Sequence, residues 1–353
     1  MSTAAVHLAH LCDVPEHPAH GDVFTAYGVL RSARPGTTRN GRPFVDVEIC
    51  DATATWAGKI WDEAVRAREQ ATTLRPGTPV KIQFAVDRYR DSAYLTVQRL
   101  RAVGDEDDVS MEALFGPGVE QVGPLACETL VFDIETIPNT DLRKVPPTIA
   151  QAVTKHADRS ESEEAKVMGL SPWFGQVVSL AFGDGSLPDG QMPVRALVVP
   201  PERSDTSAYP EWMIPVSEPE LLEAFWFLAG QAREVVTYNG RGFDVPYLVA
   251  RSLVHGIPVR VDLLSRRDQR HLDLLPLVGR AGAFRAQGPA SLDVVCWALN
   301  ITSPKGDMDG SMVAPTYAQG DIQRIAEYNV GDVEATARIY RRAASLLLPF
   351  QRG

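Results

Sequence analysis

The chain is organised around the stretch Leu130-Val131-Phe132-Asp133-Ile134-Glu135-Thr136. The apolar run from Thr129 to Phe132 predicts a short buried strand, with two acids at its end. Residues i and i+2 of a strand point to the same face of the sheet. We therefore expect Asp133 and Glu135 to project side by side, with Ile134 turned toward the core.

Two carboxylates on one face repel each other unless a positive charge lies between them. A hard divalent cation satisfies such a pair, because Mg²⁺ and Mn²⁺ prefer oxygen ligands. An isolated D-x-E also occurs at strand ends that carry two solvated acids. The choice between these interpretations depends on residues further along the chain.

Length and composition describe an ordinary globular protein. The 353 residues suggest two domains, with 44% hydrophobic and 23% charged residues. No apolar run reaches the roughly 18 residues of a membrane span, and no basic segment precedes an apolar one at the start. The cysteines form no C-x-x-C pair, so we expect a cytoplasmic protein with no membrane contact.

The charge is unevenly distributed along the chain. The net charge of −10 divides into +2 for residues 1–103 and −12 for the remainder. The acidic excess falls where a metal site would need carboxylates. A local basic groove is enough to bind nucleic acid, so the net charge does not exclude that partner.

The first 20 residues contain four histidines and a cysteine. Their spacing fits no standard zinc finger, and prolines interrupt the segment. We expect a surface arm at the edge of a domain, with a metal site as the less favoured alternative. The residues concerned are His7, His10, Cys12, His17 and His20.

The pattern then becomes that of a small β-barrel. Expected strands cover 23–32, 44–50, 55–61, 80–86 and 94–100, with a helix at 63–74. Three strands, a helix and two strands is the order of an OB-fold barrel. The sequence F-V-D-V-E-I-C-D-A-T-A-T-W-A-G-K-I-W at 44–61 resembles the OB-fold of certain bacterial exonucleases and anticodon-binding domains.

OB-folds often bind single-stranded nucleic acid through stacked aromatic rings and a basic groove. A small barrel also needs large side chains in its core, and arginines in loops are commonly just solvated. Both interpretations stay open for each candidate. The candidates are Arg39, Arg42, Phe44, Trp56, Lys59, Arg88, Tyr89 and Arg90.

Residues 104–124 are acidic, contain no basic residue and carry several Gly-Pro breaks. They predict a linker, so we expect domains at 1–103 and 125–353. In the second domain we expect strands at 129–132, 176–182, 194–199, 235–238 and 272–275. Expected helices cover 217–232, 246–254, 292–299 and 322–348, the last as one long helix or a bent pair. This gives an α/β sandwich with a mixed sheet, the ribonuclease H-like arrangement.

Three further signals join the first pair of acids. Asn239 and Phe243 lead to Asp244 in the pattern N-x-x-x-F-D. His271-Leu272-Asp273 brings another carboxylate to a strand. Tyr328 and Asp332 share one face of a helix, because they are four residues apart. Each signal alone fits a cap, a turn or core packing.

Together these motifs resemble the DEDD exonuclease superfamily in its tyrosine-bearing (DEDDy) branch. The histidine branch would place a histidine where this chain has Glu327. The chain is similar to predicted 3′–5′ exonucleases related to the proofreading domain of family B DNA polymerases. One departure is Asn329, where the resemblance leads us to expect a cysteine, outside the ligand set.

The resemblance implies a division of labour among these residues. Asp133, Glu135, Asp244 and Asp332 would hold two ions, Mg²⁺ or Mn²⁺, with Asp133 bridging them. Tyr328 would orient the attacking water. Substrate contacts would come from Asn239, Phe243 and Lys305, whereas His271 and Asp273 would be supporting, substrate-contacting or purely structural residues.

We therefore expect a metal-dependent 3′–5′ exonuclease that degrades single-stranded nucleic acid, with DNA favoured over RNA by the likeness to proofreading domains. One alternative is a catalytically silent single-strand-binding protein on an exonuclease scaffold. Another is a structural component that joins repair or replication proteins. The intact set of four acids and Tyr328 argues against a silent protein.

Overall fold

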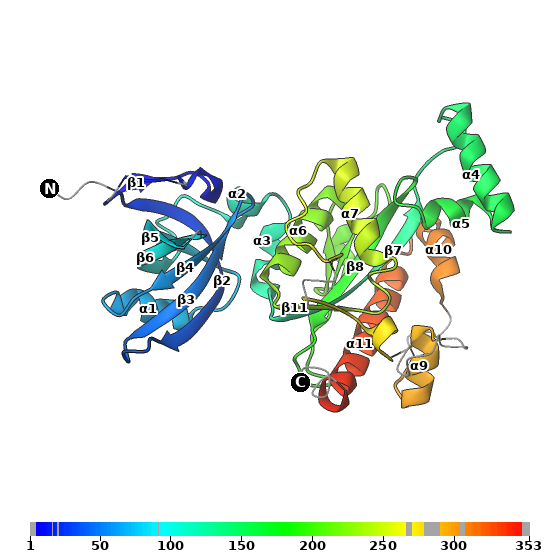
Figure 1. Cartoon of the computed structure of the whole chain (residues 1–353). Helices are drawn as coiled ribbons and strands as arrows, with labels where there is room; N and C mark the ends of the chain where they lie inside the picture. Colours follow the sequence, from blue (N-terminus) through cyan, green and yellow to red (C-terminus); the bar gives the residue numbers. More distant parts are fainter. Residues whose placement is uncertain are drawn as a thin grey trace. The chain divides into compact units, whose positions relative to one another are not determined.

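A computed structural model describes residues 5–15, 17–19, 21–90, 92–265, 270–278, 290–303 and 308–347. The chain divides into two compact units (Figure 1). The first contains the residues up to Cys127 together with Phe227–Ala232. The second contains Glu128–Trp226 and the residues from Arg233 onward.

The first unit is a closed five-stranded barrel. Its strands pair in the order β2-β3-β4-β6-β5, and β2 also pairs with β5. A helix, α1 (Val65–Thr73), connects β4 to β5. The strands are β2 (Phe24–Thr37), β3 (Pro43–Cys50), β4 (Thr55–Ile60), β5 (Thr78–Tyr89) and β6 (Ser92–Ala102).

The alternation in β3 explains the barrel's core. Val45, Val47 and Ile49 are at most 2% exposed, while Asp46 faces solvent. β2 closes the barrel by pairing with β5 through its first half and with β3 through its second. Gly28 sits at this crossing, where an added Cβ would lie 2.9 Å from the Ile49 side chain.

The N-terminal arm is more deeply packed than the sequence predicts. Its short strand β1 (Val6–His7) runs parallel to β2. Leu11 is fully buried in the barrel core, and its N–H donates to Asp51 Oδ2 at 2.7 Å. The Trp56 indole N–H donates to the Leu11 carbonyl at 2.9 Å. The arm, which the sequence predicted to lie on the surface, therefore contributes Leu11 to the hydrophobic core of the barrel.

The acidic segment after the barrel contains two short helices, α2 (Met111–Phe115) and α3 (Val119–Val122). Each helix buries apolar residues, because Phe115 and Val119 are at most 2% exposed. Asp107 accepts hydrogen bonds from Arg101 at 2.6 and 2.8 Å. The part of this segment around Asp107 is therefore attached to the barrel.

The second unit is built on a six-stranded mixed sheet of order β10-β9-β8-β7-β11-β12. β7 is antiparallel to β8 and parallel to β11, so it lies where the two pairing modes meet. The strands are β7 (Thr129–Pro138), β8 (Gly175–Asp184), β9 (Arg195–Val198), β10 (Met213–Pro215), β11 (Glu234–Thr237) and β12 (His271–Asp273).

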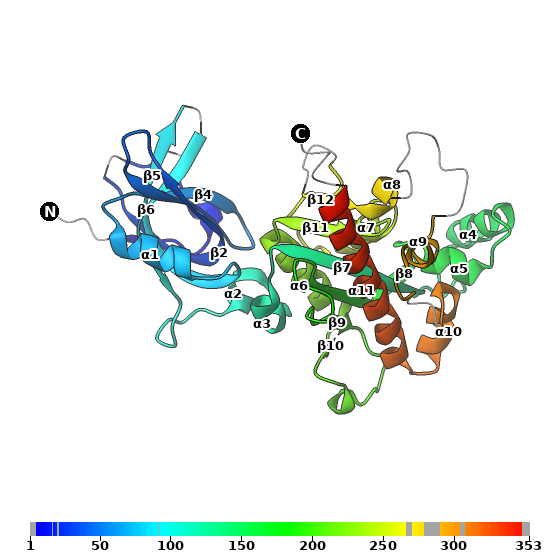
Figure 2. The same ribbon diagram turned by 90° about the horizontal axis from the view of Figure 1, so that it is seen from below.

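Helices cover both faces of this sheet (Figures 1 and 2). Val131 of β7 belongs to the core cluster that includes Ile325 and Val333 of α11 (Ile322–Leu346). Phe132 points to the other face, where its ring lies 4.7 Å from that of Phe225 in α6 (Glu218–Gln231). The core therefore consists of two layers, one on each side of β7.

Five further helices of more than one turn lie in the described part of this unit. They are α4 (Pro147–Arg159), α5 (Glu164–Gly169), α7 (Asp244–His255), α9 (Leu292–Leu299) and α10 (Val313–Ala318). A one-turn helix, α8 (Leu274–Val278), directly follows β12. Among the described residues, no helix has both the length and the apolar run needed to cross a membrane.

The mixed sheet and most of its elements agree with the sequence prediction, but three details differ. β7 continues to Pro138, so the two acids lie within the strand and not at its end. Residues 138–170, where no helix was expected, contain α4 and α5. β10, α8 and α10 were also not expected, because each has only three to six residues, and α8 begins at residue 274, within the strand expected at 272–275.

Candidate active site

The central strand β7 places two acids on one face of the sheet. Asp133 and Glu135 point the same way as Val131, toward the side covered by α11. Ile134 faces the opposite layer and is 4% exposed. β8 pairs with the strand through both acids, and β11 pairs with the residues just before them, so the sheet holds this segment in place.

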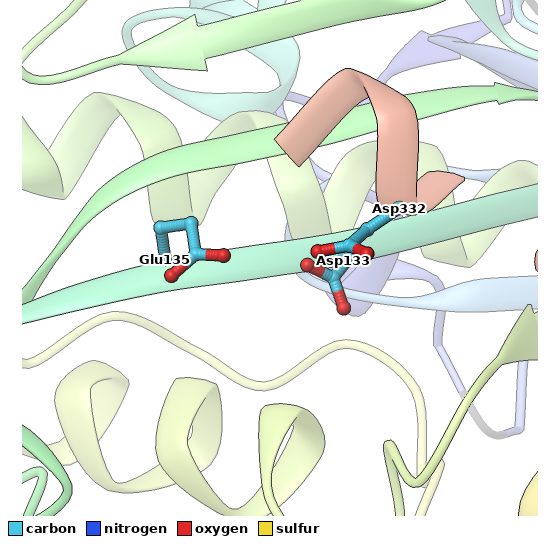
Figure 3. A group of neighbouring side chains, drawn as sticks. All are labelled: Asp133, Glu135 and Asp332. Atoms are coloured by element: carbon cyan, nitrogen blue, oxygen red, sulfur yellow. The ribbon is translucent and has the colours of Figure 1, made fainter. Parts of the chain in front are cut away.

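Asp332 of α11 completes a cluster of three carboxylates. One carboxylate oxygen from each of Asp133, Glu135 and Asp332 lies within 4.8 Å of the other two. Figure 3 shows Asp332 descending from the helix to meet Asp133, with Glu135 on the same strand. α11 reaches this point because its apolar face packs across the sheet.

The cluster concentrates negative charge in a poorly solvated place. Burial, with the neighbouring acids, raises the pKa of Asp133 and of Glu135 well above the usual carboxyl range. Among the described residues, no lysine or arginine forms an ion pair with either of them. Three carboxylates that converge in this way are an all-oxygen donor set, which fits a hard divalent cation such as Mg²⁺ or Mn²⁺.

Asp244, the first residue of α7, lies beside the cluster but not within it. Its Oδ1 accepts a hydrogen bond from the Ile134 backbone N–H at 3.2 Å. Burial raises the pKa of Asp244 to about 7, although hydrogen bonds from the backbone act in the opposite direction and lower it. Asp244 lines the same cavity as the three acids, so a fourth carboxylate is close at hand.

Tyr328 lies one helical turn before Asp332 in α11. The two residues and Asp133 line a small cavity of about 160 Å³. Burial, followed by the charges of Asp332 and the other acids, raises the pKa of the Tyr328 phenol above its ordinary value. The phenol is therefore neutral and keeps its proton as a hydrogen-bond donor.

Asn329, which the sequence placed outside the ligand set, contacts one of the expected ligands directly. The Asn329 Nδ2 group donates to Asp133 Oδ2 at 2.7 Å, and the residue is fully buried. The only signal in the sequence was its departure from the cysteine that the resemblance predicts. A polar residue on the buried face of a helix, next to a catalytic motif, could have been recognised as a contact.

The larger cavity next to the acids measures about 870 Å³. Asn239 and Phe243 line it on one side, as do residues of α5 on another. Within the described lining, Lys166 of α5 is the basic residue, and Leu170 is 56% exposed beside it. This wall could not be predicted from the sequence, because α5 itself was not expected.

α5 is held in a fixed position relative to the catalytic strand. The Gly169 carbonyl at its end accepts a hydrogen bond from Thr136 Oγ1 at 2.9 Å. The same carbonyl accepts another from the Tyr247 hydroxyl of α7 at 3.1 Å. Lys166 and Leu170 therefore extend from a helix that is attached both to β7 and to α7.

Asp273 and His271 make internal contacts. The Asp273 carboxylate accepts from the backbone N–H groups of Asn239 at 2.8 Å and Arg241 at 3.1 Å. It thereby fixes the loop in which Asn239 adopts a left-handed φ of 69°. Of the roles considered from the sequence, supporting the site loop agrees best with these bonds.

Burial lowers the pKa of His271, so its ring is neutral. Its Nδ1 lies 2.8 Å from the Leu263 carbonyl and its Nε2 lies 2.8 Å from Thr237 Oγ1. A neutral ring that donates at Nδ1 accepts from the threonine at Nε2. Lys305, the other expected substrate contact, lies outside the described residues.

The candidate nucleic-acid contacts of the barrel have mixed surroundings. Lys59 pairs with Asp46, and its Nζ lies 4.4 Å from the centre of the Phe44 ring. Trp56 is half-buried against the arm. The remaining candidates, Arg39, Arg42, Arg88, Tyr89 and Arg90, are exposed.

Two of the exposed arginines have partners, since Arg42 lies 3.7 Å from Asp62 and Arg88 lies 3.4 Å from His17. Tyr89 is 67% exposed at the tip of the β5–β6 hairpin, with the Arg90 guanidinium 5.4 Å from the centre of its ring. The His and Cys residues of the arm that the structure describes form no cluster able to hold a metal.

Residues 212–348 match the family described as "Predicted 3'-5' exonuclease related to the exonuclease domain of PolB". This confirms the resemblance predicted from the sequence for that part of the chain. The matched range includes Asn239, Asp244, Tyr328 and Asp332. It begins after Asp133 and Glu135, which the fold brings to Asp332 from outside the match.

Curated relatives match over limited stretches. The 3′–5′ exoribonuclease YhaM of Bacillus subtilis is 26% identical over 26% of this chain and 28% of its own. The catalytic polypeptide of DNA polymerase epsilon from Aspergillus fumigatus is 30% identical over 36% of this chain and 6% of its own. The chain thus spans less than a third of the length of either relative.

Among solved structures, the family B DNA polymerase of the archaeon Pyrobaculum calidifontis aligns with 90% of this chain and 46% of its own. The identity is 17% and the TM-score is 0.39. A likeness at this level carries no argument about fold or function.

Proposed function

We propose that this protein is a divalent-metal-dependent 3′–5′ exonuclease that removes nucleotides from single-stranded nucleic acid. The observation that supports it most is the meeting of Asp133 and Glu135 with Asp332, which lies inside a segment that matches an exonuclease family. The two acids of β7 lie outside the matched range, so their position is an independent argument for a phosphodiesterase site.

In this proposal Asp133, Glu135, Asp332 and the adjacent Asp244 hold two divalent ions. Bound ions of this kind lower the pKa of water and stabilise charge on the reacting phosphate and the leaving oxygen. The chain's own contribution is to arrange the acids on elements fixed by the sheet. The neutral Tyr328 phenol is positioned beside Asp133 and Asp332 to donate a hydrogen bond and orient the attacking water.

The larger cavity receives the 3′ end of the strand. Lys166 offers a charge-assisted hydrogen bond to a backbone phosphate, whose charge the acids would otherwise repel. Leu170 and Phe243 give apolar surface against which the terminal bases pack. Asn239 lines the same cavity, on a loop that Asp273 holds in place.

We further propose that the two units correspond to a barrel of OB-fold type and an α/β domain of ribonuclease H type. The strand order of the barrel and the mixed sheet around β7 support this division. Domain limits at 1–103 and 125–353, joined by 104–124, remain our proposal. The barrel binds the single strand through exposed side chains such as Tyr89 and Arg90.

We favour DNA as the substrate and keep RNA as the second choice. The family that residues 212–348 match is related to a polymerase exonuclease domain, whereas one curated relative is named an exoribonuclease. A single side chain that contacts the 2′-hydroxyl decides such a preference. The cytoplasmic location expected from the scattered cysteines stays part of the proposal.

The test is a time course with 5′-labelled single-stranded DNA and the matching RNA, in Mg²⁺, in Mn²⁺ and in EDTA. We expect a ladder that shortens from the 3′ end and disappears in EDTA. The faster substrate identifies the preferred nucleic acid. No shortening of either strand in any metal would leave the single-strand-binding protein as the better account.

A catalytically silent single-strand-binding protein on an exonuclease scaffold is the second candidate, and the barrel's exposed aromatic and basic residues favour it. The Asp133→Asn variant separates the two. An enzyme loses turnover while its binding of oligonucleotides survives, whereas a scaffold shows equal binding and no turnover with either residue.

A further inference from the structure

The buried side chain of Asn329 connects the catalytic strand to its neighbour β8. Its Oδ1 accepts from the Ser179 hydroxyl at 2.8 Å and from the Ala181 backbone N–H at 2.8 Å. Its Nδ2 donates to Asp133 Oδ2 at 2.7 Å. Asn329 and Ser179 are both fully buried, so water does not compete for these bonds.

The orientation of this amide is fixed by the backbone. The Ala181 N–H can only donate, so the atom facing it must be the amide oxygen. With Oδ1 held by two donors on β8, Nδ2 can point only toward Asp133. Asn329 therefore always presents a donor to the carboxylate.

We propose that Asn329 is a positioning residue that sets the orientation of Asp133 for cation binding. Its bond occupies one lone pair of Asp133 Oδ2 and fixes the rotation of the carboxylate. The other oxygen, and the second lone pair of Oδ2, remain for the ion shared with Glu135 and Asp332. The inference rests on the proposed metal-dependent function.

The choice of an amide at this position has a physical reason. A carboxylate at 329 would add a further negative charge to a site where three acids already converge. A cysteine, which the family resemblance predicts here, has one weak S–H donor and a weak acceptor. Only the amide both accepts two bonds from β8 and donates strongly to Asp133.

The same connection couples two elements of the site. Tyr328 and Asp332 sit on α11 beside Asn329, so the bonds from Asn329 to β8 also fix the rotation of this helix turn. Groups that orient metal ligands typically change metal affinity or activity by about 10- to 100-fold when they are removed. We expect an effect of this size, and not the complete loss that follows removal of a ligand.

The experiment uses the full chain with Asn329→Ala and, as a matched control, Ser179→Ala. The control removes one of the two bonds to Oδ1 but leaves the Ala181 bond and the donation to Asp133. Affinity for Mn²⁺ is measured without nucleic acid, by electron paramagnetic resonance of the free ion. We expect Asn329→Ala to weaken Mn²⁺ binding about 10- to 100-fold, and Ser179→Ala to weaken it less than about threefold.

Two further readouts separate positioning from structure. The melting temperature in EDTA reports the structural cost alone, and it should fall in Asn329→Ala because the Ser179 hydroxyl and the Ala181 N–H lose their acceptor. Nuclease turnover of Asn329→Ala should recover at saturating Mn²⁺. Asn329→Cys, which keeps a small side chain and a weak donor, should fall between the parent and the alanine variant in Mn²⁺ affinity.

Folded Asn329→Ala that binds Mn²⁺ as tightly as the parent would overturn the proposal. Failure of both the alanine and cysteine variants to fold would also overturn it, since Asn329 would then be a structural residue. Failure of the proposed function looks different. In that case Asp133→Asn binds Mn²⁺ as well as the parent does, and no variant or parent degrades nucleic acid.

Discussion

The acids of the first unit and the acids of the active-site cluster have opposite surroundings. In the barrel, Asp46 pairs with Lys59, and Asp107 is held by Arg101 and Lys81. In the α/β unit, Asp133 and Glu135 have no lysine or arginine partner among the described residues. Among the described residues, folding therefore pairs the first group with basic side chains and brings no such partner to the second group.

The difference extends to protonation. The hydrogen bonds from Arg101 and from the Gly104 backbone hold the pKa of Asp107 below the usual carboxyl range. Burial raises the pKa of Asp133 and of Glu135 above it. A carboxylate that is made costly to ionise is typical of functional sites, where a ligand compensates for the cost.

The largest expected effect comes from neutralising one acid of the cluster. Asp133→Asn should lower exonuclease turnover at least about 100-fold, because it removes a charge that holds the metal ions. The matched control is Asp141→Asn, since Asp141 already has Arg143 as a partner at 2.9 Å. Initial rates on labelled single-stranded DNA check this, and equal losses in both variants would contradict the comparison.

The stability of the metal-free protein should decrease as pH rises, because folding raises the pKa values of the acids that line the cavity. Their pKa values are higher in the folded protein, about 7 for Asp244, so their contribution to stability is present below the unfolded value and is lost as pH rises. Without metal, the free energy of unfolding should fall by about 1–3 kcal/mol between pH 5 and pH 8. Urea unfolding in EDTA measures this.

Asp107 predicts the opposite sign, because its lowered pKa gives stability that is lost as pH falls. Asp133→Asn should flatten the decline between pH 5 and pH 8, and Mn²⁺ should remove it in the parent. A metal-free stability that stays level across this window would mean that the acids of the cavity behave like Asp107, whose lowered pKa makes stability change only below about pH 5.

A smaller effect is expected from Lys166, the basic residue in the described lining of the acidic cavity. Lys166→Ala should raise KM about tenfold and change kcat less than about twofold, through loss of a charge-assisted bond to phosphate. Lys166→Arg should restore most of the affinity. Lys155→Ala, on the exposed surface of α4, serves as the control, and an identical rise in KM there would exclude a specific contact.

The smallest effect should come from the barrel. Tyr89→Ala should weaken binding of a long single strand about fivefold, the lower end of what loss of one stacked base predicts. Turnover of an oligonucleotide too short to reach the barrel should not change. Fluorescence anisotropy and initial rates test the two parts, and unchanged binding of the long strand would remove Tyr89 from the nucleic-acid interface.

The sequence predicted the sheet and the order of its acids because those features follow simple periods. Period two in β7 placed Asp133 beside Glu135, and a spacing of four placed Tyr328 beside Asp332. It did not predict α4, which buries only Val153 and Ala157 among its thirteen residues. The apolar residues Ile149, Val153 and Ala157 do recur at helical spacing, so this helix was missed although its periodicity was present in the sequence.

Contacts between residues far apart in the chain could not be predicted from the sequence, for a different reason. Nothing in the order of residues shows that Asn329 meets Asp133, or that Asp273 holds the loop of Asn239. Such contacts depend on how the helix crosses the sheet and on which way a single side chain turns. The chemistry of the residues was visible, whereas the partner of each was not.

The position of β7 has a consequence for how the protein comes into being. Asp133 and Asn329 are 196 residues apart in the chain, and Asp332 follows Asn329 on the same helix. During translation, the segment that carries Asp133 and Glu135 is therefore synthesised long before the segment that carries Asp332. If the chain is the nuclease we propose, its active site can form only after α11 has been translated. A nascent chain that lacks α11 therefore has no nuclease activity.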